Sequence, residues 1–304
     1  MQATVYKSTG SWYIVKADNG EILNARIKGV FKIDGITSTN PIAVGDKVAI
    51  EADTESERSV VIVKIIPRKN YIARASPHNK NQHHIVASNL DQALLFATLK
   101  NPRTSPGFID RFLVTAEAYH VPAVIIFNKT DLHKNKEEEK FAELKRIYSD
   151  IGYKVAGISL VNNQGLDEVK DLLHNKTTLI SGHSGVGKST FINSILPEKN
   201  LKTREVSGWS GKGMHTTTFA EMFDLAEGGA IIDTPGIREF ALADMPKAEL
   251  SHYFPEMRAV LPECKFNNCL HVNEPDCAVK NAVMHTGRVS PGRYISYINI
   301  LDTL

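Results

Sequence analysis

The sequence has few cysteines, almost no net charge and no long hydrophobic run. Its three cysteines are too few, and odd in number, for a disulfide framework, so we expect a reducing, cytoplasmic environment. No apolar stretch approaches the roughly 18 residues that a membrane-spanning helix needs. Residues 1–15 show no basic segment followed by an apolar one, so we expect neither a membrane partner nor secretion. The net charge of +2 permits nucleic-acid binding without indicating it.

The length and composition are those of a globular protein with several domains. A chain of 304 residues exceeds one domain of ordinary size, and 42% hydrophobic with 23% charged residues is a globular balance. The pattern of apolar residues changes twice along the chain. We therefore predict three domains, at residues 1–67, 68–240 and 241–304.

Residues 1–67 are predicted to form an all-β barrel. Runs rich in β-branched and aromatic residues are separated by turn signals such as Asn19-Gly20 and Gly45-Asp46. The expected strands are residues 4–6, 12–15, 21–23, 25–27, 47–50 and 60–66. Short strands at this spacing favour either an OB-fold that binds RNA or a small barrel with no role in nucleic-acid binding. The basic stretch 67–84 is predicted to be a linker, either solvated or in contact with RNA phosphates.

Between about residue 89 and residue 240, apolar runs alternate with helical stretches. The expected strands are 93–97, 123–127, 155–158, 178–180 and 230–232, and the expected helices are 108–119, 137–151, 166–173 and 190–196. This alternation predicts an α/β domain with a parallel sheet covered by helices. The proline-rich segment 241–304 is predicted to be small and irregular or helical.

Residues 182–189 read GHSGVGKS and match the phosphate-loop pattern G-x-x-x-x-G-K-[ST] in full. An apolar strand precedes them and a helical run follows, which is the context that the motif requires. Glycines let such a loop pass close to phosphates, so that backbone N–H groups point inward. We expect Lys188 to reach the β- and γ-phosphates and Ser189 to bind Mg²⁺. The nucleotide contacts predicted here are Gly182, His183, Ser184, Gly185, Val186, Gly187, Lys188, Ser189 and Thr190.

A second motif, Asn128-Lys129-Thr130-Asp131, follows an expected strand and resembles the N-K-x-D guanine motif. A carboxylate can accept hydrogen bonds from both N1–H and the 2-amino group of guanine, whereas adenine would leave it unpaired. A buried polar site of this kind can reject the wrong ligand by on the order of 10⁴-fold. Asp131 therefore predicts GTP and GDP as ligands rather than ATP. Asn128 is expected to brace the loop and contact the base, and the Lys129 stem to pack over the base. The backbone at Ser159 is expected to contact the guanine carbonyl.

A third motif is the D-x-x-G pattern of Asp233-Thr234-Pro235-Gly236, at the end of an apolar strand. Asp233 is predicted to bind the Mg²⁺ shell, and the Gly236 N–H to sense the γ-phosphate. Residues 207–218 are rich in glycine and hydroxyl groups. They are predicted to be a switch in which one of Thr216, Thr217 and Thr218 closes on Mg²⁺, with Thr217 favoured. A plain flexible loop is the alternative.

The position after the D-x-x-G glycine holds Ile237, where Ras-like proteins carry a water-orienting glutamine. An apolar side chain cannot polarise water, so another group must do so. His215 is the nearest candidate in the sequence, and we hypothesise that it positions the attacking water once a partner orders the loop. A surface histidine with no role is the alternative. Lys188 and Thr217 complete the predicted catalytic set.

The order of the motifs is unusual. The guanine motif comes first, followed by the phosphate loop, the switch and D-x-x-G, whereas ordinary GTPases begin with the phosphate loop. The same sheet can form if the original ends are joined and the chain is cut after the D-x-x-G strand. The order therefore predicts a circularly permuted P-loop GTPase domain.

All three cysteines lie near the C-terminus, as Cys264, Cys269 and Cys277, with His271 between the last two. Three thiolates and one imidazole complete a tetrahedral Zn²⁺ site with no open position for water, so a structural role is predicted. Free buried cysteines beside an unrelated histidine are the alternative. His285 is a second candidate for the histidine ligand.

The permuted order, the cysteine–histidine cluster and the switch sequence Gly213-Met214-His215-Thr216-Thr217-Thr218 together resemble the bacterial ribosome small-subunit-dependent GTPase A family, RsgA. The resemblance covers essentially the whole chain. It implies an N-terminal OB-fold, a central permuted GTPase and a C-terminal zinc-binding domain. It also implies a late role in 30S subunit maturation, contacts with 16S rRNA, and hydrolysis of GTP to GDP stimulated by the 30S subunit.

Two residues depart from related patterns. Met214 stands where a basic residue is common in relatives, so no contact from that position is expected. Gly185 stands where potassium-activated GTPases commonly have asparagine, so no potassium dependence is expected.

Two other functions stay open. Ile237 leaves room for an RNA-binding module that uses nucleotide as a structural ligand with little hydrolysis of its own. A GTPase that acts on a membrane or transport target is disfavoured, because no amphipathic basic helix is evident. The chain is expected to act as a monomer.

Overall fold

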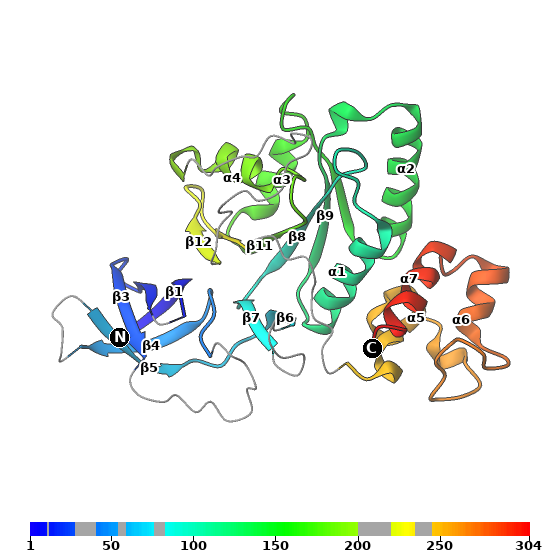
Figure 1. Cartoon of the computed structure of the whole chain (residues 1–304), viewed down its shortest axis with the longest axis horizontal. Helices are drawn as coiled ribbons and strands as arrows, with labels where there is room; N and C mark the ends of the chain where they lie inside the picture. The colour runs from blue at the N-terminus through cyan, green and yellow to red at the C-terminus, as the bar shows by residue number, and fades with distance from the viewer. Residues whose placement is uncertain (11, 28–40, 54–58, 76–82, 200–219, 235–244) are drawn as a thin grey trace, which may run out of the picture.

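The N-terminal strands form a closed barrel. The computed structural model describes residues 1–304 except 11, 28–40, 54–58, 76–82, 200–219 and 235–244 (Figure 1). The barrel strands are β1 (Gln2–Ser8), β2 (Tyr13–Ala17), β3 (Ile22–Ile27), β4 (Lys47–Ala52) and β5 (Ser59–Ile65). They pair in the order β1-β2-β3-β5-β4, and β4 also pairs with β1, which closes the barrel. β3 and β5 run parallel and the other barrel pairs antiparallel, so the predicted OB-fold is confirmed.

Alternating burial explains why these segments become barrel strands. In β2, Tyr13, Val15 and Ala17 are buried and the residues between them are partly exposed. A period of two places alternate side chains on one face, here the face that lines the barrel core. The prediction of two strands at 21–23 and 25–27 is wrong. A single strand, β3, runs through both, because Asn24 pairs with β2 and with β5.

The stretch 67–84 is not a plain linker, contrary to the prediction. It contributes to a hairpin of β6 (Tyr71–Ala75) and β7 (His83–Ser88). The Arg68 guanidinium binds both carboxylate oxygens of Asp46 at 2.6 Å, and the Asp46 side chain is fully buried. Basic charge at Arg68 is therefore one half of a buried ion pair between this segment and the barrel.

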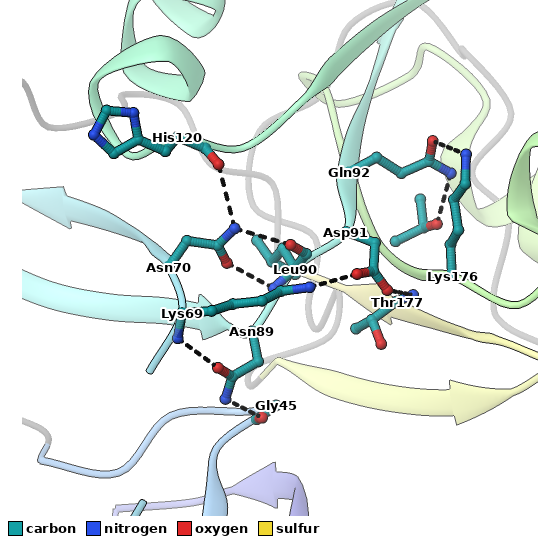
Figure 2. Close-up of polar contacts among 11 residues, drawn as sticks. Gly45, Lys69, Asn70, Asn89, Leu90, Asp91, Gln92, His120, Lys176 and Thr177 are labelled. Atoms are coloured by element: carbon teal, nitrogen blue, oxygen red, sulfur yellow. Dashed lines mark hydrogen bonds and ion pairs between the residues drawn. The ribbon is translucent and has the colours of Figure 1, made fainter. Parts of the chain in front are cut away.

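Figure 2 shows how the segments next to the hairpin join the barrel to the central sheet. The Asn89 side chain accepts a hydrogen bond from the Lys69 N–H at 3.0 Å and donates one to the Gly45 carbonyl at 2.9 Å. The Lys69 ammonium pairs with Asp91, and the second Asp91 oxygen accepts from the Thr177 N–H at 2.8 Å. One network of polar contacts thus joins the barrel and the central sheet through the residues on either side of the hairpin.

The central domain is a mainly parallel sheet. Its elements are β8 (Gln92–Ala97), α1 (Pro106–Ala118), β9 (Ala123–Phe127), η1 (Thr130–Leu132), α2 (Asn135–Asp150), β10 (Lys154–Gly157), α3 (Leu166–Leu173), β11 (Thr177–Ser181), α4 (Lys188–Ile195), η2 (Pro197–Lys199), β12 (Glu221–Asp224) and β13 (Ala230–Asp233). The strand order is β10-β9-β8-β11-β13-β12, and β12 runs antiparallel to β13. The first of these strands in the chain, β8, therefore lies in the interior of the sheet, between β9 and β11.

Helices cover both faces of this sheet (Figure 1). Helices α1 and α2 pack over one face, where the buried residues include Leu95, Phe112, Leu113, Ile125, Leu144 and Tyr148. Helices α3 and α4 pack over the other, where the buried residues include Phe96, Ile126, Val169, Leu173, Ile180, Phe191 and Ile192. Strand β8 is buried at every residue, which is typical of a parallel strand covered on both sides.

The barrel and the central sheet also meet edge to edge. Strand β1 pairs antiparallel with β12, with Lys7 opposite Glu221, so that an 11-stranded sheet runs through both parts. The Lys7 ammonium lies 2.7 Å from the Glu221 carboxylate. The Asp224 carboxylate of β12 also contacts the barrel: it accepts hydrogen bonds from the Tyr6 hydroxyl at 2.5 Å and from the Lys16 ammonium at 2.7 Å.

Residues 245–304 form a small, mostly helical unit on the outer side of α1 (Figure 1). Its elements are η3 (Lys247–Tyr253), α5 (Pro255–Arg258), η4 (Leu261–Glu263), α6 (Ala278–Asn281), η5 (Ala282–Thr286) and α7 (Pro291–Leu301). Its own core includes Leu250, Phe254, Met257, Tyr297 and Ile300. Across the part of the chain that the structure describes, no helix combines the length and apolar character that crossing a membrane requires.

Candidate functional site

The predicted nucleotide motifs meet at one edge of the central sheet. Strands β9, β10, β11 and β13 are parallel, and each ends at a predicted site residue or within two residues of one. In open α/β sheets, ligands bind outside the carboxyl ends of such strands. The guanine motif, Ser159, the phosphate loop and Asp233 therefore share one edge, although the sequence separates them widely.

The phosphate loop leads from β11 into α4. Gly182, Gly185 and Gly187 have φ angles of 137°, 84° and 101°, which side chains disfavour. A Cβ at Gly182 would also lie 2.4 Å from the Phe96 carbonyl oxygen, so the tight turn requires glycine there. Lys188 begins α4, and its ammonium donates to the carbonyls of Gly182 at 2.6 Å and His183 at 2.9 Å. The ammonium thus lies against the loop that precedes it.

Lys188 sits in an unusual electrostatic setting. Burial lowers its pKa, and the nearby Asp233 carboxylate opposes that shift. Asp233 is only 5% exposed and lies opposite Ile180 in the pairing of β13 with β11. The next residue, Thr234, donates from its hydroxyl to the Ile180 carbonyl at 3.3 Å. Both charges predicted to act on the phosphates and their metal are therefore fixed beside the same strand.

The guanine motif touches the phosphate loop directly. The Asn128 amide donates to the Val186 carbonyl at 2.8 Å, and Asn128 is 1% exposed. A Cβ at Gly187 would lie 2.2 Å from the same amide nitrogen. The close approach explains why the loop has glycine at this position, and it joins two motifs that the permutation has placed in reversed order.

Asp131 is held by a residue from the segment that follows β10. The Ser159 hydroxyl donates to the Asp131 carboxylate at 2.6 Å, and Ser159 is fully buried. The Thr130 N–H donates to the Ile158 carbonyl at 3.1 Å, so the loop is anchored on both sides. Sequence reasoning assigned Ser159 only a backbone contact with guanine. The structure adds that its hydroxyl orients the carboxylate predicted to select the base.

Lys129 adopts a left-handed conformation with φ of 64°, and its ammonium donates to the Asn101 carbonyl. Burial lowers the pKa of Lys129, and the Asp131 charge opposes this shift. Ser189 and Thr190 lie in the first turn of α4, where Ser189 is partly buried and Thr190 exposed. Three other predicted site residues, His215, Thr217 and Gly236, lie outside the described residues.

The loop between β8 and α1, residues 98–105, was not among the predicted site residues. Its Thr104 hydroxyl lies 2.6 Å from His183 Nε2 in the phosphate loop, and its Asn101 carbonyl accepts a hydrogen bond from the Lys129 ammonium. A topological signal was available, because β8 lies between β9 and β11 and its carboxyl end must reach the same edge. Burial lowers the pKa of His183; its hydrogen bond to the Ser184 carbonyl opposes this, while Lys188 and Lys129 add to it.

A second cluster lies in the C-terminal unit. The ligand atoms of Cys264, Cys269, His271 and Cys277 all lie within 4.8 Å of one another. His271 Nδ1 is 3.4 Å from the Cys277 sulfur and 3.8 Å from the Cys264 sulfur. The cluster could hold a metal ion. The alternative ligand His285 is not part of it.

The turn that carries His271 is held by its neighbours. The Glu274 carboxylate accepts three hydrogen bonds from this turn, from the backbone N–H groups of Leu270, Val272 and Asn273. The Tyr294 and Tyr297 hydroxyls of α7 donate to the carbonyls of residues 271 and 270, at 2.6 and 2.8 Å. Burial lowers the pKa of His271, which favours the neutral imidazole that a metal needs.

Comparison with known proteins identifies the family to which this chain belongs. The profile of the RsgA GTPase family matches residues 65–243, and that of the RsgA N-terminal domain matches residues 2–60. The chain belongs to the RsgA GTPase family. Proteins named small ribosomal subunit biogenesis GTPase RsgA from Christiangramia forsetii and Flavobacterium psychrophilum are 51% and 50% identical to it over 303 residues. These alignments cover 99% of this chain and 96% and 93% of those proteins.

Two solved structures share this fold over nearly the whole chain. The crystal structure of YjeQ from Thermotoga maritima matches with a TM-score of 0.79 and 32% identity, covering 100% of this chain and 98% of that one. The structure of YloQ, described as a circularly permuted GTPase, matches with a TM-score of 0.72 and 28% identity over 99% and 94% of the two chains. As a member of the RsgA GTPase family, the protein is a GTP hydrolase. The permuted order predicted from the sequence is confirmed.

Proposed function

We propose that this RsgA GTPase binds the small ribosomal subunit, assists its late maturation, and hydrolyses GTP to GDP and phosphate with stimulation by that subunit. The observation that carries the nucleotide part is the 2.8 Å contact between Asn128 of the guanine motif and Val186 of the phosphate loop. It supports one pocket in which a base and a triphosphate are bound together. The ribosomal part rests on the names of relatives that are about half identical over nearly their whole length.

In this proposal the backbone of residues 182–187 surrounds the phosphates, and Lys188 neutralises charge on the β- and γ-phosphates. Its ammonium has to leave the carbonyls of Gly182 and His183 to do so. Ser189, Asp233 and Thr217 would hold Mg²⁺, which when bound neutralises charge on the phosphate oxygens. Gly236 would sense the γ-phosphate. Thr190 would contribute a further phosphate contact at the start of α4.

Base selection is assigned to Asp131. Its carboxylate accepts from Ser159 through Oδ1, which leaves the second oxygen and its other lone pairs for guanine. Lys129 and Thr130 complete the wall of the base pocket. Because burial makes an unpaired carboxylate costly, an adenine base would be rejected.

Water activation is assigned to His215, since Ile237 cannot polarise water. Positioning by an imidazole is compatible with a low basal rate that rises when a partner orders the switch. A second reading, an RNA-binding module with little hydrolysis of its own, would show no such rise.

The metal of the C-terminal cluster is proposed to be one structural Zn²⁺. Soft thiolates with a single imidazole are the donor set that zinc prefers in closed tetrahedral sites. Tetrahedral Zn–S bonds of about 2.3 Å place sulfur atoms about 3.8 Å apart, and the ligand atoms here lie within 4.8 Å of one another. A small contraction would complete the site. The zinc would then fasten the turn around residue 271 to α6.

We further propose the division into domains at residues 1–67, 68–240 and 241–304, action as a monomer in the cytoplasm where ribosomal subunits assemble, and 16S rRNA contacts by the barrel. The Trp12 side chain, directly before β2, is 53% exposed. An exposed aromatic ring can stack on an unpaired base, which contributes about 1–3 kcal/mol per base in related systems.

The test is GTP turnover by the purified chain alone, with small subunits, and with large subunits as the matched partner control. A Lys188→Ala variant corrects for contaminating hydrolases. Because partners stimulate GTPases by up to about 10⁵-fold, we expect at least about tenfold stimulation by small subunits only. Equal rates with and without small subunits would refute the ribosomal part, and failure to bind GTP would refute the nucleotide part.

A further inference from the structure

The first turns of α1 lie between the phosphate loop and the C-terminal unit. Phe108 and Asp110 are two residues apart on this helix, so their side chains leave it about 200° apart, on opposite sides. The Phe108 ring meets the His183 ring edge to face, with centroids 5.5 Å apart. The Asp110 carboxylate binds Arg293 of α7 at 2.7 Å. One helical turn therefore contacts the nucleotide site on one side and the C-terminal unit on the other.

At the nucleotide end, the hydrogen bonds of Thr104 and His183 are directional. The Thr98 N–H donates to the Thr104 hydroxyl oxygen at 3.0 Å, so that hydroxyl is free to donate its proton to His183 Nε2 at 2.6 Å. The other ring nitrogen, Nδ1, lies 3.2 Å from the Ser184 carbonyl and must donate to it. Both contacts suit a single neutral tautomer. Thr104 thereby fixes a ring that belongs to the phosphate loop.

Thr104 is also joined to the start of α1. The next residue, Ser105, caps the helix, and its hydroxyl accepts from the Phe108 N–H at 3.2 Å. The Thr104 N–H donates to the Thr98 carbonyl at 2.7 Å, which closes the loop on the end of β8. A displacement of α1 would therefore carry Thr104 with it.

At the other end, Arg293 is 2% exposed and holds two acids from different parts of the chain. It binds Glu256 through two nitrogens at 2.7 and 3.2 Å and Asp110 through a third at 2.7 Å. Its guanidinium lies 4.6 Å from the Phe254 ring centre. The Tyr148 hydroxyl of α2 donates to the same Asp110 oxygen at 2.8 Å.

Such a network fixes a position more sharply than apolar packing does. Buried ion pairs add little stability compared with well-packed hydrophobic residues, whereas their directional bonds define one arrangement. The second Asp110 oxygen has no hydrogen-bond partner among the described residues, so the network is not optimised for stability. It is well suited to holding α1 at one place along α7.

We propose that Arg293 is a positioning residue for nucleotide binding, which acts on the phosphate loop through the first turns of α1 and the Thr104–His183 hydrogen bond. The inference rests on the nucleotide site proposed above. It gives the C-terminal unit a role in setting the nucleotide affinity of the central domain, because α7 carries Arg293.

The test is a double-mutant cycle on the dissociation constant of fluorescent GDP. Thr104→Val removes the hydroxyl and keeps the shape, and Arg293→Lys keeps the charge and loses the two-point grip on Glu256. Each substitution is expected to raise the dissociation constant of GDP by about threefold or more. Because both interrupt one chain of contacts, the double variant should bind GDP no more weakly than the weaker-binding of the two single variants. Distant, unconnected sites would multiply within about twofold.

A matched control comes from the same interface. The Arg258 guanidinium binds Glu117 at the far end of α1 at 3.2 Å and is half exposed. Arg258→Lys combined with Thr104→Val is expected to give multiplying effects. Melting temperatures are recorded for every variant, and the losses in stability should add even where the losses in affinity do not. If Arg293→Lys does not fold, Tyr148→Phe replaces it, because it removes only one hydroxyl bonded to Asp110.

The outcomes separate this inference from the proposed function. If the affinity loss of Arg293→Lys or Tyr148→Phe multiplies with that of Thr104→Val, as expected for the Arg258→Lys control, the positioning role of Arg293 is refuted. The proposed nucleotide site would still stand. Affinity losses that saturate support the positioning role. If the unmodified chain does not bind GDP, the proposed nucleotide site is wrong, and so is the positioning role of Arg293.

Discussion

Gly187→Ala tests the junction between the two nucleotide motifs. Gly187 precedes α4 with φ of 101°, and its Cβ would lie 2.2 Å from the Asn128 amide nitrogen and 3.4 Å from Leu160. Asn128 is buried and donates to Val186 at 2.8 Å, so it has no room to retreat without breaking that bond. The added methyl group must therefore displace either the guanine motif or the phosphate loop.

The magnitude follows from two costs. A side chain forced into left-handed backbone costs about 1–2 kcal/mol. Loss of a buried hydrogen bond that leaves a polar group unpaired costs about 1–3 kcal/mol. Gly187→Ala is therefore expected to lower the free energy of unfolding by about 2–5 kcal/mol. If only about 1.4 kcal/mol of this falls on binding, the affinity for GDP weakens about tenfold.

Gly152→Ala is the matched control. Gly152 has a similar φ of 98°, and a Cβ there meets no atom within 4 Å. It should show the backbone cost alone and leave GDP affinity unchanged. Urea unfolding measures the stability of both variants, and titration with fluorescent GDP measures their affinity. If Gly187→Ala binds GDP as tightly as the unmodified chain, the contact between the motifs has no role in binding.

Three further predictions concern other parts of the chain. Arg293→Met leaves two buried carboxylates without their cation and should lower the free energy of unfolding by about 3–5 kcal/mol, measured by urea unfolding; a loss below about 1 kcal/mol would contradict a buried network. Cys277→Ser should abolish the one bound metal ion per chain in elemental analysis and lower the melting temperature; retention of the metal would exclude this cluster. Burial lowers the pKa of His183 below 6.5, so the unfolded chain binds a proton that the folded chain excludes. Stability contributed by the neutral ring is thus present above about pH 6.5 and lost as the pH falls towards the lowered pKa. His183→Gln should flatten this decline in melting temperature between pH 7.5 and 5.5, and parallel profiles would count against it.

Local patterns predicted the central sheet well. Residues 123–127 are an unbroken apolar run, and the strand occupies those residues because a parallel strand covered on both faces has no solvent side to encode. The helix expected at 137–151 is Asn135–Asp150, since a stripe of apolar residues marks its buried face but not its ends. The phosphate loop could likewise be recognised from the spacing of its glycines alone.

Contacts between distant segments could not be read in this way. Arg68 looked like a solvated linker charge because its partner Asp46 lies 22 residues earlier in the chain, in the barrel. Ser159 was assigned a backbone role, whereas the fold brings its hydroxyl to Asp131. Thr104 carries no motif, and its contact with His183 follows only from the neighbouring positions of β8 and β11. Each pairing depends on tertiary packing, which a single sequence does not record.

The most direct test of the nucleotide site is a reversal of base preference by Asp131→Asn. An asparagine amide can donate to the 2-carbonyl of xanthine, where the aspartate can only accept from the 2-amino group of guanine. Competition of GTP, XTP and ATP against fluorescent GDP or XDP measures the preference. We expect the unmodified chain to bind GTP and the variant to bind XTP, both with ATP excluded. An unmodified chain that binds ATP as well as GTP, or a variant that keeps its preference for GTP, would contradict the assignment of Asp131.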